Sequence, residues 1–153
     1  MNELPEELKK DSPESILAML SWLTESNYRL EEQHYSPKHF GNAALIWSKW
    51  PMAFRLSRDR GRWFVNLAGS WDEAPPRSSD GSKWYWETIW NAYLIGRDEA
   101  FQPIKQVELD SAVDFFISRA DEIRRSLTDD EEINSALSEI KLKIYKENFP
   151  DSL

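Results

Sequence analysis

Two histidines, His34 and His39, are the side chains best suited to bind a metal or move a proton at neutral pH. Their separation of five residues fits neither a helical two-histidine metal pair nor the H-E-x-x-H pattern. The chain contains no cysteine, which excludes thiolate metal sites, cysteine nucleophiles and disulfides. It also lacks the G-x-S-x-G elbow, the Walker loop and the G-x-G-x-x-G loop. We therefore expect no catalytic residue, metal or cofactor, and predict that the protein is not an enzyme.

Basic and aromatic residues alternate in the centre of the chain. The basic side chains are Lys49, Arg55, Arg58, Arg60 and Arg62, and tryptophan and phenylalanine lie between and around them. Strands with this pattern can stack on and clamp single-stranded nucleic acid. The competing interpretation is that these arginines pair with acidic residues of the helices, or locally with Asp59. We favour pairing, because both ends of the chain offer many carboxylates.

An acidic run near the C-terminus is the clearest candidate for contact with a basic partner. It consists of Asp129, Asp130, Glu131 and Glu132. At the start of a helix such a run is stabilised by the macrodipole, so helix formation alone accounts for it. The same carboxylates could instead meet basic groups on another protein.

Tryptophan is unusually frequent, with eight residues, seven of them between positions 47 and 90. Large aromatic residues dominate both protein cores and interface anchors. We expect four or five of the indoles to be buried or half-buried, because each buried indole N–H needs a partner. The others are candidates for a contact surface, with Trp71, in a polar loop, and Trp84 as the predicted partner-binding residues.

Length and composition fit one domain spanning residues 1–153. The net charge is −8, but residues 37–69 carry six bases and one acid, whereas both ends of the chain are acidic. A negative net charge argues against general nucleic-acid binding and fits a basic partner. Solubility is an equally simple explanation of the negative charge. No apolar run is long enough for a membrane helix, and the polar start does not resemble a secretion signal. We therefore expect a cytoplasmic protein.

The elements that would position these residues begin with a loose acidic lead-in at 1–11. A helix follows at about 13–27, with Ser12 as its cap, and then a connection at 28–39. Alternating apolar residues predict three strands between about 43 and 67, with Arg55 on the face opposite Met52, Phe54 and Leu56. The R-D-R-G sequence at 58–61 predicts a three-residue hairpin loop with a bulge.

Residues 69–83 are rich in Pro, Gly and Ser and predict a long surface loop. Apolar spacing then predicts a helix at about 85–95 with Gly96 as its C-cap, or alternatively a strand at 84–86. Two more helices follow, the first capped by Asp110 and the second opened by a capping box of Thr128 and Glu131. The predicted fold class is α+β, with a small antiparallel three-stranded meander packed against N-terminal and C-terminal helices.

Two segments carry a resemblance to a known family. They are Ser36-Pro37-Lys38-His39-Phe40-Gly41-Asn42 and the R-D-R-G-R-W-F-V hairpin at 58–65. Together they resemble small bacterial immunity proteins of toxin–immunity systems, of the contact-dependent inhibition type. The likeness covers roughly residues 36–67, with a weaker echo at Trp84-Tyr85. It implies a protein that binds and blocks one cognate toxin domain, and it supplies no catalytic residues. In the F-G-N segment, Gly41 is expected to permit a tight turn and Asn42 to bond local backbone.

Three hypotheses follow. The first is an immunity protein that neutralises a cognate toxin domain, a nuclease being one candidate, through the acidic run and the aromatic residues around Trp71 and Trp84. The second is a module for single-stranded nucleic acid or a nucleotide that uses Arg55, Arg58, Arg60 and Arg62. The third, an enzyme with a carboxylate site, has no constellation of residues to support it.

Overall fold

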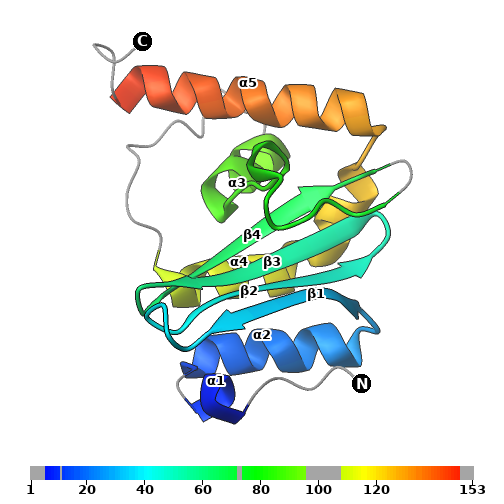
Figure 1. The fold of residues 1–153 in the computed structure, drawn as a ribbon. Helices are drawn as coiled ribbons and strands as arrows, with labels where there is room; N and C mark the ends of the chain where they lie inside the picture. The colour runs from blue at the N-terminus through cyan, green and yellow to red at the C-terminus, as the bar shows by residue number, and fades with distance from the viewer. Residues whose placement is uncertain (1–5, 11, 72–73, 96–107, 149–153) are drawn as a thin grey trace.

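The computed structural model describes residues 6–10, 12–71, 74–95 and 108–148, and places helices on one face and along one edge of an antiparallel sheet (Figure 1). The fold is α+β as predicted, but the sheet has four strands rather than three. No helix in the described part of the chain is long and apolar enough to cross a bilayer. The strands are β1 (Arg29–Ser36), β2 (Asn42–Lys49), β3 (Met52–Asp59) and β4 (Arg62–Gly69). The helices are α1 (Glu6–Lys10), α2 (Glu14–Glu25), α3 (Glu87–Ile95), α4 (Leu109–Ser126) and α5 (Asp130–Asn148), with a 3-10 turn, η1, at Gly81–Lys83.

The sheet is a meander in the order β1-β2-β3-β4, and its register fixes which side chains share a face. Phe54 of β3 lies opposite Trp47 of β2 and Leu67 of β4, and all three are buried in the main core. Arg55 lies opposite Asn66, one residue further along, so both point to the other face. This confirms the strand phase predicted for Arg55.

β1 lies in the segment at 28–39, which the sequence predicts to be a connection and not a strand. β1 pairs antiparallel with β2, with a register shift between Leu30 and Glu32. Its sequence, RLEEQHYS, is polar because the strand lies at the edge of the sheet, where much of it stays in contact with water. Polar side chains and a bulge together remove the alternation by which a half-buried strand is recognised.

The β3–β4 hairpin turns on two residues rather than on the three-residue loop predicted. Arg60 and Gly61 have φ of 52° and 83°, and the flanking Asp59 and Arg62 pair with each other. Two central residues with positive φ make a type I′ turn, whose twist matches that of the strands. The N–H of Arg60 donates to Oδ1 of Asn42 at 2.8 Å. Asn42 therefore ties the two hairpin loops at this end of the sheet together, instead of bonding local backbone as expected.

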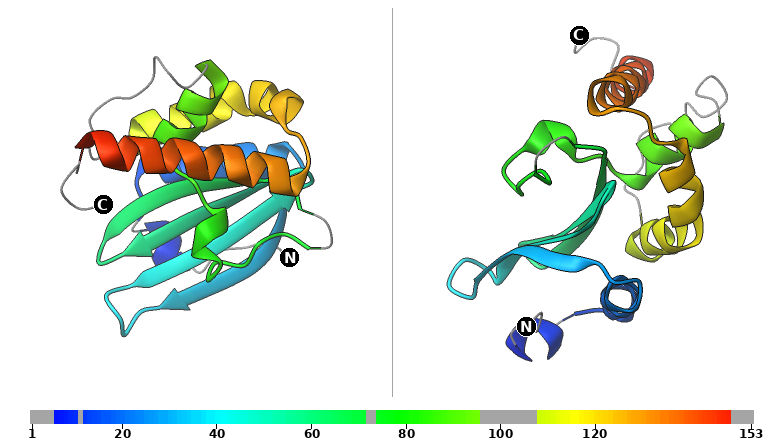
Figure 2. Two further views of the ribbon diagram at one scale, coloured as in Figure 1. Left: turned by 90° about the horizontal axis from the view of Figure 1, so that it is seen from above. Right: turned by 90° about the vertical axis from the view of Figure 1, so that its right-hand side faces the viewer.

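The main core lies between the sheet and the two helices α2 and α4, which cover the same face (Figure 2). A chain of aromatic rings crosses this core, with centroids 5.4–5.6 Å apart, in the range where tilted and edge-to-face pairs are favourable. The rings are Trp22, Tyr28, Phe54 and Phe116. α3 lies at the β4 edge, and α5 packs against α3 as an outer layer.

The N-terminal lead-in contains α1, a short helix that was not predicted. Leu8 is fully buried in the main core, and Oγ of Ser12 donates to the Leu8 carbonyl at 2.6 Å. Ser12 therefore closes α1, and Pro13 rather than Ser12 takes the N-cap position of α2. The helix predicted at 13–27 is confirmed as α2.

The first of the two predicted C-terminal helices is confirmed as α4, with a different residue at its start. α4 begins at Leu109 with Glu108 at the N-cap position, so Asp110 lies in the first turn and is not the cap. Burial of Val113 and Phe116 follows the predicted apolar face.

The segment after the long loop combines the two structures considered for it. Tyr85 forms an isolated antiparallel bridge with Leu67 of β4, and α3 begins at Glu87. Gly96, the predicted C-cap of α3, lies outside the described residues.

Seven of the eight tryptophans are buried or half-buried, more than the four or five expected. A second, smaller core on the opposite face of the sheet accounts for part of the difference. In it Trp84 packs on Ile46, Ala53 and Ala68, and the half-buried Trp71 lies against this group. Trp50 is the exception, with 67% of its surface exposed.

Candidate functional site

The acidic run forms the start of α5. Oδ1 of Asp129 accepts the N–H of Glu132 at 2.9 Å, so Asp129 caps the helix at the position predicted for Thr128. Glu131 and Glu132 are exposed. Within the described residues, no ion pair joins Asp129, Glu131 or Glu132 to a base. The side chain of Asp130 lies outside the described residues. Glu131 and Glu132 therefore present to solvent carboxylates that no ion pair within the described residues neutralises.

The two predicted aromatic contacts differ in exposure. Trp84 is 2% exposed, and its Nε1 donates to the Arg77 carbonyl at 2.9 Å. The expectation that Trp84 is exposed is therefore wrong, because the indole closes the second core. Trp71 is half-buried at the edge of that core.

Three hydrogen bonds bring segments distant in sequence to the start of α5 (Figure 1). Oγ of Ser70 donates to the Thr128 carbonyl at 2.6 Å, and the Ser70 N–H donates to the Pro51 carbonyl at 2.7 Å. Nε1 of Trp50 donates to the Trp71 carbonyl at 3.2 Å. The β2–β3 turn, the segment after β4 and the start of α5 therefore share one end of the molecule.

We call the resulting patch the acidic–tryptophan surface. It contains Trp50, Trp71, Asp129, Glu131 and Glu132. Trp71 and the acidic run were predicted as contact residues, and the structure brings them to the same end. Trp50 was not predicted. Its signal in the sequence was the Trp50-Pro51 turn between two strands, since a hairpin tip carries its side chains away from the core.

The four arginines of the predicted nucleic-acid surface do not share a face. Arg58 lies opposite the buried Trp63, on the side of the main core, and its guanidinium reaches the backbone of Gly41. Arg55 and Arg62 point to the opposite face, and the guanidinium of Arg62 lies 5.6 Å from the ring centroid of Phe64. Arg60 lies at the hairpin tip. Because side chains alternate between the two faces of a strand, these arginines are distributed over both faces of the sheet.

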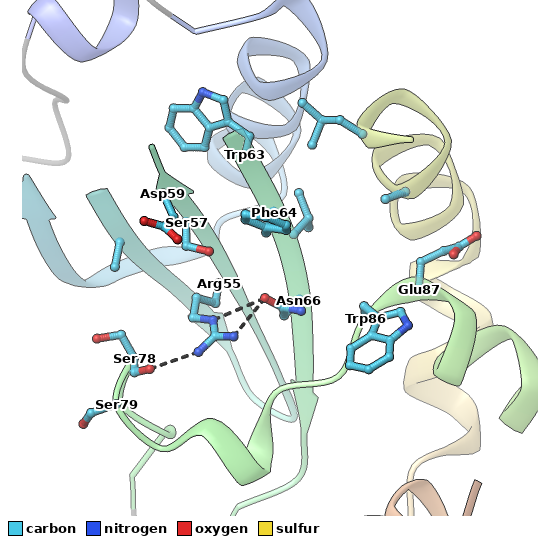
Figure 3. Close-up of a pocket in the computed structure, with 14 residues that line it drawn as sticks. Arg55, Ser57, Asp59, Trp63, Phe64, Asn66, Ser78, Ser79, Trp86 and Glu87 are labelled. Atoms are coloured by element: carbon cyan, nitrogen blue, oxygen red, sulfur yellow. Dashed lines mark hydrogen bonds between the residues drawn. The ribbon is translucent and has the colours of Figure 1, made fainter. Parts of the chain in front are cut away.

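Arg55 lies instead in a pocket of about 630 Å³, shown in Figure 3. Its Nε and Nη2 donate to Oδ1 of Asn66 at 3.3 and 3.0 Å, and its Nη1 donates to the Ser78 carbonyl at 3.0 Å. The guanidinium also lies 5.3 Å from the ring centroid of Trp84. Burial lowers the pKa of Arg55 from its usual value, but arginine remains a cation throughout the physiological range. We call this space the Arg55 pocket.

The Arg55 pocket crosses β4, from the second face of the sheet to α3 and α4. Phe64 of β4 lies between Arg55 on one side and Trp86 on the other (Figure 3). Glu87, at the start of α3, lies on the Trp86 side, and its partial burial raises its pKa. The pocket thus has a cation at one end, aromatic rings in the middle and a carboxyl group at the other end.

One wall of the Arg55 pocket is held in place by Glu32 of β1. A carboxylate oxygen of Glu32 accepts a short hydrogen bond from Oγ of Ser78, and His34 Nε2 lies 2.8 Å from the same carboxylate. Burial alone would raise the pKa of Glu32, but the bonds from the Ser78 hydroxyl and N–H and from His34 outweigh it and lower the pKa. The loop that carries Ser78 is therefore tied to an ionised side chain.

Replacing Glu32 by glutamine is expected to lower the free energy of unfolding by about 1–2 kcal/mol near neutral pH. Because the folded-state pKa lies below the unfolded one, this stabilisation is present above the unfolded pKa and is lost as pH falls through the folded pKa. Urea unfolding of wild type and Glu32→Gln across this range measures the difference. The control is Asp114→Asn, an exposed change within α4, which should show no such trend. A Glu32→Gln difference that is constant with pH would contradict the expectation.

The histidines have local partners. His34 contacts Glu32, and Nδ1 of His39 lies 2.5 Å from Oγ of Ser36. In the part of the chain that the structure describes, no three His, Cys, Asp or Glu side chains are grouped as a metal site would require. Comparison with models of known protein families, with curated proteins and with solved structures finds no match to this chain.

Proposed function

We propose that the protein is an immunity protein, which binds a cognate bacterial toxin domain and neutralises it by stoichiometric occlusion in the cytoplasm. The observation that carries the proposal is the acidic–tryptophan surface, where the exposed Trp50 lies at the same end as the unpaired Glu131 and Glu132. The resemblance of residues 36–67 to immunity proteins supports the same conclusion.

The two kinds of residue on this surface have different parts in binding. Unpaired carboxylates attract a basic partner and accelerate encounter, as a nuclease with a basic active-site cleft would require. An exposed indole that becomes desolvated in the complex slows dissociation, because large aromatic anchors dominate interface energies. A nuclease is therefore the toxin class that this surface fits best.

The proposal is tested by co-expressing the chain with the toxin domain encoded immediately upstream of its gene. We expect a 1:1 complex by native mass spectrometry and rescue of growth. We expect Trp50→Ala to weaken the complex by about 2 kcal/mol, roughly 30-fold, because its indole is the most exposed large anchor on the surface.

The matched control is Phe40→Ala. Phe40 is 75% exposed and lies in the β1–β2 loop, at the opposite end of the strands from Trp50. Its replacement should leave affinity unchanged. Absence of both complex and rescue would refute the immunity function. Equal losses of affinity from Trp50→Ala and Phe40→Ala would be compatible with the immunity function but would mean that the interface is not the acidic–tryptophan surface.

The nucleic-acid alternative has narrower support. Arg55 and Arg62 share a face with Phe64, whereas Arg58 lies on the other side of the sheet. Three cationic or aromatic side chains on one face give a short stacking surface. Binding of labelled single-stranded oligonucleotides that weakens with salt would support this alternative, and no binding at low salt would remove it.

A further inference from the structure

The guanidinium of Arg55 is half-buried and has unused donors. Three of its N–H groups bond to neutral acceptors, the Asn66 amide oxygen twice and the Ser78 carbonyl once. Because arginine carries five N–H donors, two remain, and no ion pair joins Arg55 to a carboxylate among the described residues. A partly desolvated cation that contacts only neutral groups can accept an anion without first breaking an ion pair.

The aromatic side chains beside Arg55 supply a flat apolar surface. Phe64 is 41% exposed although it lines the Arg55 pocket, so one part of its ring remains available. Trp86 lies on the other side of Phe64, with Nζ of Lys141 5.6 Å from its ring centroid (Figure 3). Exposed aromatic rings inside a pocket are the surfaces on which heteroaromatic bases stack.

Polar groups at both rims add directional contacts. Ser57 and Ser79 line the pocket near Arg55, and Asp59 and Glu87 offer carboxyl groups further from the guanidinium (Figure 3). These carboxyl groups would repel a second anion but can accept N–H bonds from an amino group on a ring.

The edge of β4 provides backbone groups as well. The N–H and C=O of Leu67 both bond to Tyr85, so they point away from β3. Backbone direction alternates along a strand, so the N–H and C=O of Trp63 and Val65 also point away from β3. Both residues line the Arg55 pocket, and no backbone bond to these groups is present within the described residues.

We propose that the Arg55 pocket binds a mononucleotide, with the phosphate on Arg55 and the base against Phe64. The volume, about 630 Å³, lies within the range of small-molecule sites, roughly 300–1,000 Å³. A cation, an exposed ring and distant hydrogen-bond acceptors match the three parts of such a ligand, the phosphate, the base face and the base edge. This inference does not rest on the proposed toxin binding, because the Arg55 pocket shares no lining residue with the acidic–tryptophan surface.

The test titrates the full chain with the four ribonucleoside 5′-monophosphates, the corresponding nucleosides and inorganic phosphate, by calorimetry and by ¹⁵N chemical shifts. We expect at least one monophosphate to bind with a dissociation constant on the order of 10–100 µM. The shift changes should centre on Phe64, Asn66 and the Trp86 indole. The nucleosides and inorganic phosphate should each bind at least about tenfold more weakly than the monophosphate, since each lacks half of the contacts.

Variants separate the two halves of the site. Arg55→Gln should weaken binding about tenfold or more by removing the cation, and Phe64→Ala should do so by removing the stacking ring. Phe64 is exposed and outside both cores, so Phe64→Ala remains decisive if Arg55→Gln does not fold. Arg29→Gln, an exposed change at the start of β1 outside the pocket, should leave binding unchanged.

Each contrary result overturns the proposal. Nucleosides that bind as tightly as monophosphates would refute the role of Arg55, and phosphate that binds as tightly would refute the role of Phe64. Shift changes centred elsewhere would place the ligand outside the pocket. Absence of binding for every monophosphate at millimolar concentration would show that the pocket has no such ligand.

Discussion

Replacing Trp90 by alanine is expected to lower the free energy of unfolding by about 3–5 kcal/mol, the largest effect that we expect from one substitution in this chain. Trp90 is fully buried, and its Nε1 donates to the Leu67 carbonyl at 3.0 Å. Its ring lies edge-on to Tyr93, with centroids 5.9 Å apart. A Cβ on Gly69 would lie 3.1 Å from the indole, so the ring fills the space between α3 and β4. Alanine would leave a large void there.

Denaturant unfolding followed by circular dichroism measures this effect, and two further variants identify its cause. Trp90→Phe keeps most of the buried apolar surface and loses the bond to Leu67, so it should cost about 1–2 kcal/mol. Trp50→Ala, at an exposed indole, should cost about 0.5 kcal/mol or less. A Trp90→Ala loss no larger than that of Trp50→Ala would mean that α3 does not depend on this contact.

The second large effect concerns the rate of association with the toxin domain. Glu131→Lys with Glu132→Lys is expected to slow association about tenfold at low ionic strength, because the reversal replaces attraction of a basic partner by repulsion. The difference should shrink as salt is added, since exposed charges are screened. Dissociation should change less. Asp129 is left intact because it caps α5, and its loss would add an effect on stability.

Stopped-flow or surface-plasmon measurements of the rate constants, at several salt concentrations, test this expectation. The control is Glu6→Lys with Glu14→Lys, which changes the net charge equally at exposed positions of α1 and α2, on the far side of the molecule from α5 (Figure 1). A slowing of the same size in the control would attribute the effect to total charge. No slowing in either variant would exclude the acidic run from the encounter.

The sheet was predictable wherever one face of a strand is buried and the other is not. The sequence predicted β3 from the alternation of Met52, Phe54 and Leu56 with polar or small residues, because burial on one face imposes a period of two. β1 has no such period, since an edge strand keeps polar residues on both faces and this one also carries a bulge. Pairing with β2, rather than its own residues, makes β1 a strand.

The candidate sites show the same division. The four consecutive acidic residues were evident in the sequence. Only the structure shows that the carboxylate of Asp129 is used to cap α5, so that it is less available to a partner than the others. Trp84 and Trp50 are each preceded by a Ser-Lys pair in the sequence. The fold buries Trp84 on Ala53 and Ala68 and leaves Trp50 at a hairpin tip. Exposure depends on contacts between distant residues, which local sequence does not contain.

The sequence by itself determined the α+β class, the central hairpins, the amphipathic helices α2, α4 and α5, and the separation of a basic centre from acidic ends. These properties follow from periodicity and composition, which are local. Only the tertiary structure decided that Arg55 lies opposite Asn66, that Ser70 joins the loop after β4 to the start of α5, and that the Arg55 side chain lines a pocket. Each of these depends on strand register or on a hydrogen bond between residues far apart in the chain. Such long-range pairing is set by the packing of the whole molecule.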